Sequence, residues 1–267
     1  MAKQRVGSTL SHPDIKRGQL RGVEEATLLA SFGGRGLITE VVDTIGDGKE
    51  ATVYLCRAHP STDEQWCVAK VYRAQKFRAF SNAASYNDGT GRLDKRMARA
   101  MKKRTAVGQR LIHHEWVARE WETLCVLADA GADVPEPYES SPDAILMEYV
   151  QAGDGPDGEP APLLCQAELG RGEARELFAC AMHNVELFLR CDRVHGDLSG
   201  YNILYTGDGL RIIDLPQAVD PRSHPGARDL LFRDVDHVCR QFARFGVRED
   251  ARRIASRLWS RFIHARL

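Results

Sequence analysis

The sequence predicts an α+β fold in which a small, β-rich N-terminal lobe is followed by a helical C-terminal lobe. Short β-branched runs separated by turn residues fill the first part of the chain, a pattern typical of antiparallel strands. A segment rich in glycine and proline follows at 153–162, and helical periodicity dominates after it. We therefore expect an N-terminal lobe of residues 26–152, a C-terminal lobe of residues 153–267 and a flexible, polar N-terminal arm of residues 1–25.

Turn residues and periodicity define the elements of the N-terminal lobe. The turn at 46–48 separates two strand-like runs, and a polar turn separates the second run from a third, which predicts antiparallel hairpins. The expected elements are strands at 38–45, 52–57, 66–72 and 144–150 and helices at 24–32 and 111–130. The apolar face expected for the longer helix holds Trp116, Trp121, Leu124 and Leu127.

Helical patterns fill most of the C-terminal lobe. We expect helices at 173–190, 228–245 and 249–267, and a tight hairpin of strands 203–205 and 210–213. The last helix carries a short apolar stripe at the end of a helical lobe. We expect this stripe to pack on the preceding helix rather than on a membrane.

The amino-acid composition excludes some classes of protein but does not identify one. Among 267 residues, 37 are Lys or Arg and 37 are Asp or Glu, so net charge gives no argument for general nucleic-acid binding. The seven cysteines form no C-x-x-C pair, which favours reduced thiols over disulfides or a zinc site. The sequence shows neither a secretion signal nor an apolar run of membrane-spanning length. We expect a cytoplasmic protein with no membrane contact.

A basic insertion is expected at 74–110. Within it, residues 92–110 contain a single acid, Asp94. The basic residues of this stretch are Arg92, Lys95, Arg96, Arg99, Lys102, Lys103, Arg104 and Arg110. A solvated helix or mobile insertion is one interpretation, because like charges repel and stay hydrated. The alternative is a docking patch for phosphate groups, on RNA or on a ribosome.

The chemistry-bearing residues begin with His195-Gly196-Asp197, followed by Asn202. In the catalytic loop of kinases, an Asp orients or deprotonates the acceptor hydroxyl, and an Asn five positions later holds a metal. Asp214 lies twelve residues after Asn202, at the end of an apolar strand. Because Mg²⁺ prefers carboxylate and phosphate oxygens, Asn202 and Asp214 are the expected ligands for Mg²⁺, with Mn²⁺ as an alternative.

Lys70 is the expected contact for ATP phosphates. It lies in Val68-Ala69-Lys70-Val71, which is similar to the lysine strand of kinases, where the ammonium neutralises developing charge. A glutamate on the predicted helix 111–130 could pair with it, and Glu115, Glu120 and Glu122 are the candidates.

A glycine-containing loop at 46–53, here called the nucleotide loop, precedes this strand. It follows G-x-G-x-x-G-x-V with Ala51 at the third glycine, and backbone N–H groups in such turns bind anions. The interlobe hinge is expected near 148–150, where backbone groups would hydrogen-bond adenine. The expected ATP-binding residues are Gly46, Gly48, Lys49, Val53, Lys70, Glu148 and Val150.

With these motifs in order, the sequence resembles the RIO family of atypical serine/threonine protein kinases, specifically its type-1 branch. The resemblance rests mainly on Gly48–Tyr54 (GKEATVY), Ala69–Tyr72 (AKVY), His195–Ser199 (HGDLS) and Ile213–Val219 (IDLPQAV). Glu120 aligns with the family's helix-C glutamate, so the resemblance selects it as the partner of Lys70. One departure is that Gly200-Tyr201 replaces a more usual acidic and aromatic pair.

The resemblance implies a truncated bilobal protein-kinase-like fold with no activation segment. It further implies ATP and Mg²⁺ binding, with serine/threonine phosphorylation, ATPase cycling or both. The catalytic residues would be Asp197, Asp214, Lys70 and Glu120, with Asp214 as an aspartyl-phosphate acceptor. The resemblance further implies a role in maturation of the small ribosomal subunit, as for other members of the family.

Two other function classes are compatible with parts of the sequence. A small-molecule phosphotransferase of the aminoglycoside- or choline-kinase type shares H-G-D-L-x-x-x-N-I-L, but normally has a longer C-terminal lobe than the 53 residues (267 − 214) that follow Asp214. An ATP-binding pseudokinase scaffold is the non-enzyme alternative, although every expected catalytic residue is present. The protein substrate, if there is one, is not identifiable from the sequence.

Overall fold

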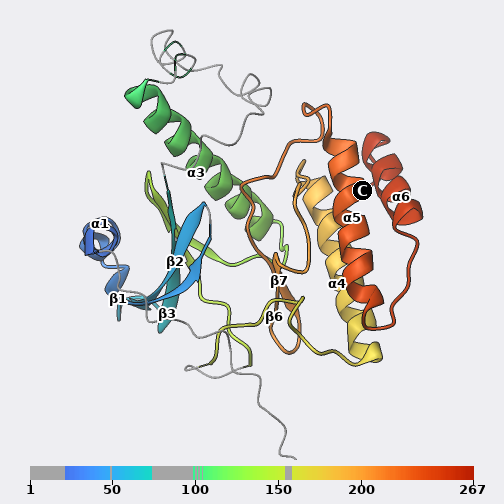
Figure 1. Cartoon of the computed structure of the whole chain (residues 1–267), viewed down its shortest axis with the longest axis horizontal. Helices are drawn as coiled ribbons and strands as arrows, with labels where there is room; N and C mark the ends of the chain where they lie inside the picture. The colour runs from blue at the N-terminus through green and yellow to red at the C-terminus, as the bar shows by residue number, and fades with distance from the viewer. Residues whose placement is uncertain are drawn as a thin grey trace, which may run out of the picture.

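The computed structural model describes residues 22–48, 50–73, 99, 101, 103, 105–153 and 158–267. The predictions for residues 1–21, for Lys49, and for most of the basic insertion therefore lie outside the described residues. In Figure 1 an antiparallel sheet and one long helix occupy one side, and a group of helices occupies the other. The predicted α+β class, with β-structure before helices, is confirmed.

The N-terminal sheet has five strands in the order β1-β2-β3-β5-β4, all of them antiparallel to their neighbours. Its strands are β1 Ile38–Asp47, β2 Ala51–Ala58, β3 Trp66–Tyr72, β4 Pro137–Ser140 and β5 Ala144–Glu148. The sequence prediction missed β4, because its prolines indicated a turn. Pro137 begins an edge strand, where proline removes no ladder hydrogen bond that the sheet needs.

A short helix, α1 Gly22–Ser31, and the 3₁₀ turn Gly33–Arg35 precede the sheet. Leu28 and Phe32 are fully buried against the apolar residues of β1 and β2, and the Tyr54 hydroxyl donates to Glu24. Residues 22–25 are therefore helical, and the predicted flexible arm of residues 1–25 is wrong for that stretch.

The long helix α3 runs from Ala106 to Asp129. It begins earlier than expected because the Thr105 hydroxyl caps it by accepting from the Gly108 N–H at 3.1 Å. Its buried residues include His113, Val117, Glu120, Thr123, Leu124 and Leu127. Trp116 and Trp121 are partly buried and pack against the same core as Leu124 and Leu127, as expected, and the buried face also contains a glutamate.

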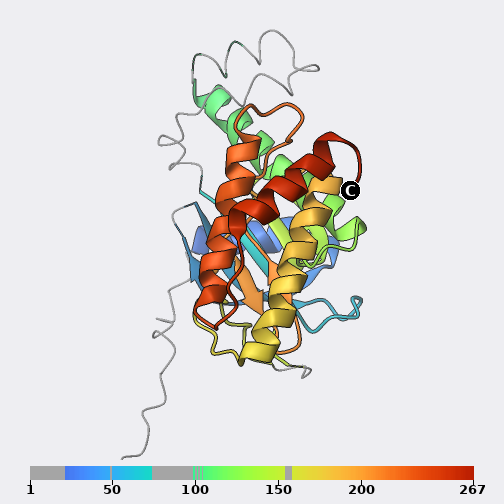
Figure 2. The ribbon, with the colours of Figure 1, turned by 90° about the vertical axis from the view of Figure 1, so that its right-hand side faces the viewer.

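The C-terminal lobe is built from α4 Arg171–Arg190, α5 Ala227–Ala243 and α6 Ala251–Ile263 around the hairpin of β6 Ile203–Tyr205 and β7 Leu210–Ile212. Figure 2 shows α6 crossing α4 and α5. Ile254, Ala255 and Leu258 of α6 are buried in this contact, so the predicted packing of the last helix is confirmed. Within the described residues, no helix is long and apolar enough to cross a membrane.

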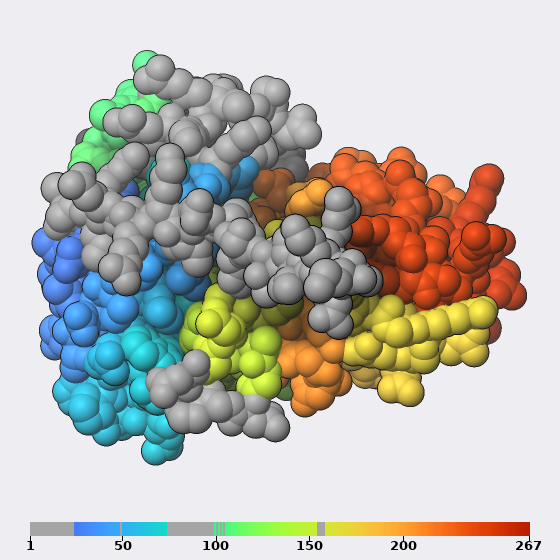
Figure 3. Space-filling view, turned by 60° about the horizontal axis from the view of Figure 1, so that its bottom comes forward, coloured from blue at the N-terminus to red at the C-terminus, as the bar shows by residue number. Residues whose placement is uncertain are grey.

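The larger apolar core joins the two lobes. It is centred on α3, α4 and α5, and it also takes in Ala51, Tyr72 and Ile145 from the sheet. Figure 3 shows residues near position 150 between the sheet and the C-terminal helices. Lys70 of β3 thereby lies next to Asp214, two residues beyond the end of β7.

Candidate functional site

The predicted catalytic loop, residues 195–202, is held by hydrogen bonds at both ends. The Asn202 Nδ2 donates to the Asp197 carbonyl at 2.8 Å, and the Asn202 N–H donates to the Ser199 carbonyl at 2.9 Å. The Ile213 N–H donates to the Asn202 carbonyl at 3.0 Å, which ties the loop to the strand leading to Asp214. The amide nitrogen of Asn202 is therefore used within the loop, and its amide oxygen is the atom that could contact a cation.

The catalytic loop is also held by Asp234, a buried carboxylate that the sequence analysis missed. Asp234 of α5 is 2% exposed and accepts from the N–H groups of Gly196 at 2.8 Å and Leu198 at 3.1 Å. Burial raises the pKa of Asp234 to about 7, against the two N–H donors that lower it. The sequence feature that could have identified Asp234 is its place among the apolar core positions of α5, where Leu231, Val235 and Val238 are buried beside it.

His195 links the catalytic loop to the strand before Asp214. Its Nε2 lies 3.1 Å from the Ile213 carbonyl, and its Nδ1 lies 3.2 Å from the Asp197 N–H. Since a carbonyl only accepts, we assign the proton to Nε2, leaving Nδ1 to accept. Burial lowers the pKa of His195, so the neutral ring is a structural bridge rather than an exposed base.

The Lys70 ammonium contacts carboxylates from both lobes. Its Nζ lies 2.7 Å from Oε1 of Glu120 and 2.7 Å from Oδ1 of Asp214. Burial alone would lower the pKa of Lys70, but the two carboxylates outweigh it and raise that pKa. The predicted pairing of Lys70 with Glu120 is present in the structure, across fifty residues of sequence.

Asp214 has a constrained backbone as well as a paired side chain. Its φ is +67°, in the left-handed region that non-glycine residues seldom adopt. Burial would raise the pKa of Asp214, but Lys70 lowers it below its usual value. Such strain is typical of functional positions, and here it places an ionised carboxylate between the lobes.

Among the described residues of the site, carboxylates outnumber basic side chains around Lys70. Glu50 of the nucleotide loop, which the sequence analysis did not select, interacts electrostatically with Asp214, Lys70 and Asp197. Burial is the main cause that raises the pKa of Glu50, and the charge of Asp214 adds to it. The oxygen donors of Asn202 and Asp214 are of the hard type that Mg²⁺ prefers, although the described residues contain no cluster of three or more His, Cys, Asp or Glu side chains that could hold a metal by themselves.

The nucleotide loop forms the turn between β1 and β2. Gly46 pairs with Val53 and Val53 pairs with Lys70 across the sheet, so the base of the loop lies at the same level of the sheet as Lys70. The Gly48 N–H donates to the Ala51 carbonyl at 2.9 Å. Lys49 lies outside the described residues.

At the predicted hinge, backbone groups of Glu148 and Val150 already have partners. The Glu148 N–H donates to the Glu136 carbonyl at 2.9 Å, and the Val150 carbonyl accepts from the Ala161 N–H at 3.0 Å. An adenine ring would therefore have to use the Glu148 carbonyl and the Val150 N–H.

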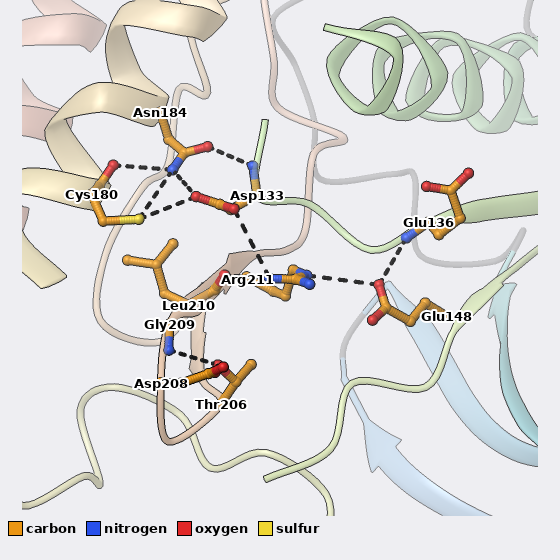
Figure 4. A network of polar contacts seen from close by, with 10 residues as sticks. All are labelled: Asp133, Glu136, Glu148, Cys180, Asn184, Thr206, Asp208, Gly209, Leu210 and Arg211. Atoms are coloured by element: carbon orange, nitrogen blue, oxygen red, sulfur yellow. Dashed lines mark hydrogen bonds and ion pairs between the residues drawn. The ribbon is translucent and has the colours of Figure 1, made fainter. Parts of the chain in front are cut away.

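A polar network behind the hinge couples the lobes, as Figure 4 shows. Arg211 of β7 lies 3.7 Å from the Glu148 carboxylate and 4.0 Å from the Asp133 carboxylate. The fully buried Asn184 of α4 donates to that Asp133 carboxylate at 2.7 Å and accepts from the Asp133 N–H at 2.6 Å. Residues from β5, α4, β7 and the segment after α3 are thus joined around one arginine.

Together, the antiparallel sheet with its lysine–glutamate pair and the helical lobe with its aspartates define a protein of bilobal, protein-kinase-like fold. One solved structure with this fold is the Rio2 kinase–ADP/Mg²⁺–phosphoaspartate complex of Chaetomium thermophilum. It matches with a TM-score of 0.62 and 21% sequence identity over 92% of this chain and 71% of the other.

The RIO domain matches residues 52–254, and the chain belongs to the RIO domain family. The human serine/threonine-protein kinase RIO1 is 31% identical over 215 residues, which cover 80% of this chain and 35% of the human protein. The human serine/threonine-protein kinase RIO3 is 27% identical over 223 residues, with coverage of 80% and 40%. This chain thus spans about two fifths or less of these relatives. The predicted family and kinase-like fold are confirmed.

Proposed function

We propose that this chain is an ATP- and Mg²⁺-dependent phosphotransferase of the RIO type-1 branch, acting as a serine/threonine kinase, an ATPase or both. The observation that carries the proposal is the contact of Lys70 Nζ with both Glu120 and Asp214 at 2.7 Å. This contact brings a lysine of the sheet, paired with a helix glutamate, next to the aspartate that follows the catalytic loop, and these are the residue types that phosphoryl transfer uses. The names of the RIO1 and RIO3 relatives support the same activity.

Each site residue has a role that follows from its position. Lys70, held by Glu120, would contact ATP phosphates. Asn202 and Asp214 would hold Mg²⁺, and a bound Mg²⁺ neutralises charge on the transferring phosphoryl group. Asp197, whose carbonyl is fixed by Asn202, would accept the proton of the attacking hydroxyl.

The nucleotide would lie between the nucleotide loop and the hinge. Gly46, Gly48, Lys49 and Val53 would cover it from above, with lobes of residues 26–152 and 153–267 on either side. Its adenine would meet backbone groups of Glu148 and Val150.

Asp214 is also a candidate acceptor for the phosphoryl group. A carboxylate oxygen of Asp214 would attack the γ-phosphorus, the bond from that phosphorus to the bridging oxygen would break, and ADP would leave with the electron pair. Water would then hydrolyse the acyl phosphate to Asp214 and inorganic phosphate. The Rio2 kinase complex of Chaetomium thermophilum contains a phosphoaspartate, and the lowered pKa of Asp214 supplies the ionised nucleophile here.

Labelling with γ-³²P-ATP and Mg²⁺ tests this proposal. We expect protein-bound label that hydroxylamine removes, because an acyl phosphate is hydroxylamine-labile and phosphoserine is not. The label should disappear in Asp214→Asn and persist in the matched control Asp208→Asn, which changes an exposed turn residue near the same hairpin. Asp197→Ala should lose transfer to a hydroxyl while it still binds ATP.

Two results would overturn parts of the proposal. Hydroxylamine-resistant label that survives Asp214→Asn would move the acceptor to a hydroxyl group. Failure of the wild-type chain to bind or turn over MgATP would remove the phosphotransferase function altogether. Ribosome or RNA contact through residues 92–110 and cytoplasmic localisation stay predictions.

A further inference from the structure

We propose that Arg73 is a positioning residue that holds the nucleotide loop in the shape that receives phosphates. This inference rests on the proposed nucleotide function and names a residue on which it depends. Arg73 follows the last residue of β3 and lies only three positions after Lys70. It was not among the residues that the sequence motifs selected.

Four hydrogen bonds join Arg73 to the loop. Its Nη1 donates to the Gly48 carbonyl at 2.8 Å, and its Nη2 donates to the Thr52 hydroxyl at 2.5 Å and to the Asp47 carboxylate. Its backbone N–H donates to the Glu50 carbonyl at 2.8 Å. One residue therefore fixes the last residue of β1, the turn and the start of β2.

Burial makes these bonds specific rather than incidental. The Arg73 side chain is 15% exposed, whereas the Asp47 side chain is 67% exposed, so the arginine is the fixed member of the pair. The planar guanidinium presents its donors in a rigid fork, and its acceptors are Asp47 at the end of β1, Gly48 in the turn and Thr52 in β2. A lysine at this position would supply charge but could not reproduce the fork.

The positive charge of Arg73 should also affect phosphate binding. Asp47 lies in the loop that would cover the nucleotide phosphates, and an unpaired carboxylate there would repel them. Pairing with Arg73 offsets that repulsion while the guanidinium holds the turn. We therefore expect Arg73 to affect the binding of phosphates and not the binding of the adenosine part.

Binding titrations on the whole chain test this with MgATP and with adenosine. Arg73→Met keeps much of the aliphatic stem and removes the fork, and we expect MgATP binding to weaken roughly 10-fold while adenosine binding stays within about 2-fold. Arg73→Lys should also weaken MgATP binding. Adding Asp47→Asn to Arg73→Met should restore part of the loss, because the unpaired carboxylate is then gone.

Arg57→Met is the matched control. Arg57 lies at the other end of β2, where its guanidinium stacks 4.4 Å from the Trp66 ring centre and approaches Glu40 at 3.6 Å. It should leave the affinity for MgATP unchanged. Thermal melting of every variant shows whether the fold is retained.

Three results would overturn the inference. Unchanged MgATP affinity in Arg73→Met would show that the loop does not need the arginine. Equal weakening of adenosine and MgATP binding would indicate a general loss of structure, and wild-type MgATP affinity in Arg73→Lys would assign the effect to charge alone. If the wild-type chain bound no MgATP, the proposed function would fail first, and this inference with it.

Discussion

The two loops that face each other across the site are held in different ways. The catalytic loop is fixed from below by Asp234, which is 2% exposed, and from the side by His195, which is also 2% exposed. The nucleotide loop is fixed mainly by Arg73, and one of its partners, Asp47, is largely exposed. One loop is anchored in the core of the C-terminal lobe, and the other is braced at the surface of the sheet.

This difference matches what each loop would have to do. A group that accepts a proton or holds a metal must keep its geometry within a fraction of an ångström, which buried hydrogen bonds supply. A loop that covers a nucleotide must let the nucleotide enter and leave, which a single partly exposed arginine permits. We infer that changes in the catalytic loop reduce turnover, whereas changes in the nucleotide loop reduce affinity.

The largest expected effect contrasts a glycine from each loop. Gly196 has φ +79°, and a Cβ there would lie 2.5 Å from the Gln217 carbonyl oxygen, whereas a Cβ on Gly48 would meet its nearest atom, the Ala51 carbonyl oxygen, at 3.4 Å. Gly196→Ala should lower the free energy of unfolding by roughly 3 kcal/mol, through backbone strain and a clash with main chain. Gly48→Ala should change it by less than about 1 kcal/mol.

Urea unfolding followed by circular dichroism measures both values. Equal destabilisation by the two alanines would contradict the difference in anchoring between the loops. A Gly196→Ala variant with wild-type stability would show that the segment around Gln217 can move aside.

The second largest expected effect is a fall in kcat when Asp234 is replaced. In Asp234→Asn the amide oxygen can accept from one of the Gly196 and Leu198 N–H groups, but the amide nitrogen cannot accept from the other. The loop should shift, and kcat should fall roughly 100-fold, as misplacement by about 1 Å can cause. MgATP affinity should stay near wild type, the reverse of the result expected for Arg73→Met.

The same residue gives a pH dependence with a defined sign. The folded pKa of Asp234, about 7, lies above its ordinary value of 3.8, so folding takes up a proton at this site. Its contribution to stability is full below about pH 4 and is lost as pH rises through about 7. The stability of the wild type relative to Asp234→Asn should therefore decline from pH 4 to pH 8, and a difference that is constant with pH would contradict the raised pKa.

The residues of the site show which parts of it could be predicted from the sequence. Lys70, Asp197, Asn202 and Asp214 were selected from short local motifs, whereas Glu120 was selected from three glutamates only by the family resemblance. The structure brings Lys70 next to Glu120 and Asp214, and the roles of these residues stay predictions. The supporting residues were not found because their partners are distant in sequence.

Three examples show the limit. Asp234 meets Gly196 thirty-eight positions away, and Arg73 meets Asp47 twenty-six positions away. In both cases the residue type alone predicts a solvated surface charge, and only the fold shows its acceptors or donors. The strand β4 was missed for the opposite reason, because a local proline signal indicated a turn at what is the edge of a sheet.

The smallest expected effect tests whether the firm anchoring of the C-terminal lobe extends to its helix packing. Arg261 of α6 donates to both oxygens of Glu186 on α4, at 2.6 and 2.9 Å, and these hydrogen bonds are the main cause that lowers the pKa of Glu186, against a smaller effect of burial. Because the folded pKa lies below the usual 4.5, the stabilisation is present above that pH and is lost as pH falls. Glu186→Gln should lower the free energy of unfolding by about 1 kcal/mol at pH 7, and the difference should shrink as the pH falls below 4.5. Asp236→Asn, which removes an exposed pair with Arg240, should cost less than about 0.5 kcal/mol. Equal losses from the two variants in urea unfolding would show that the two-point contact between α4 and α6 adds nothing beyond an ordinary surface pair.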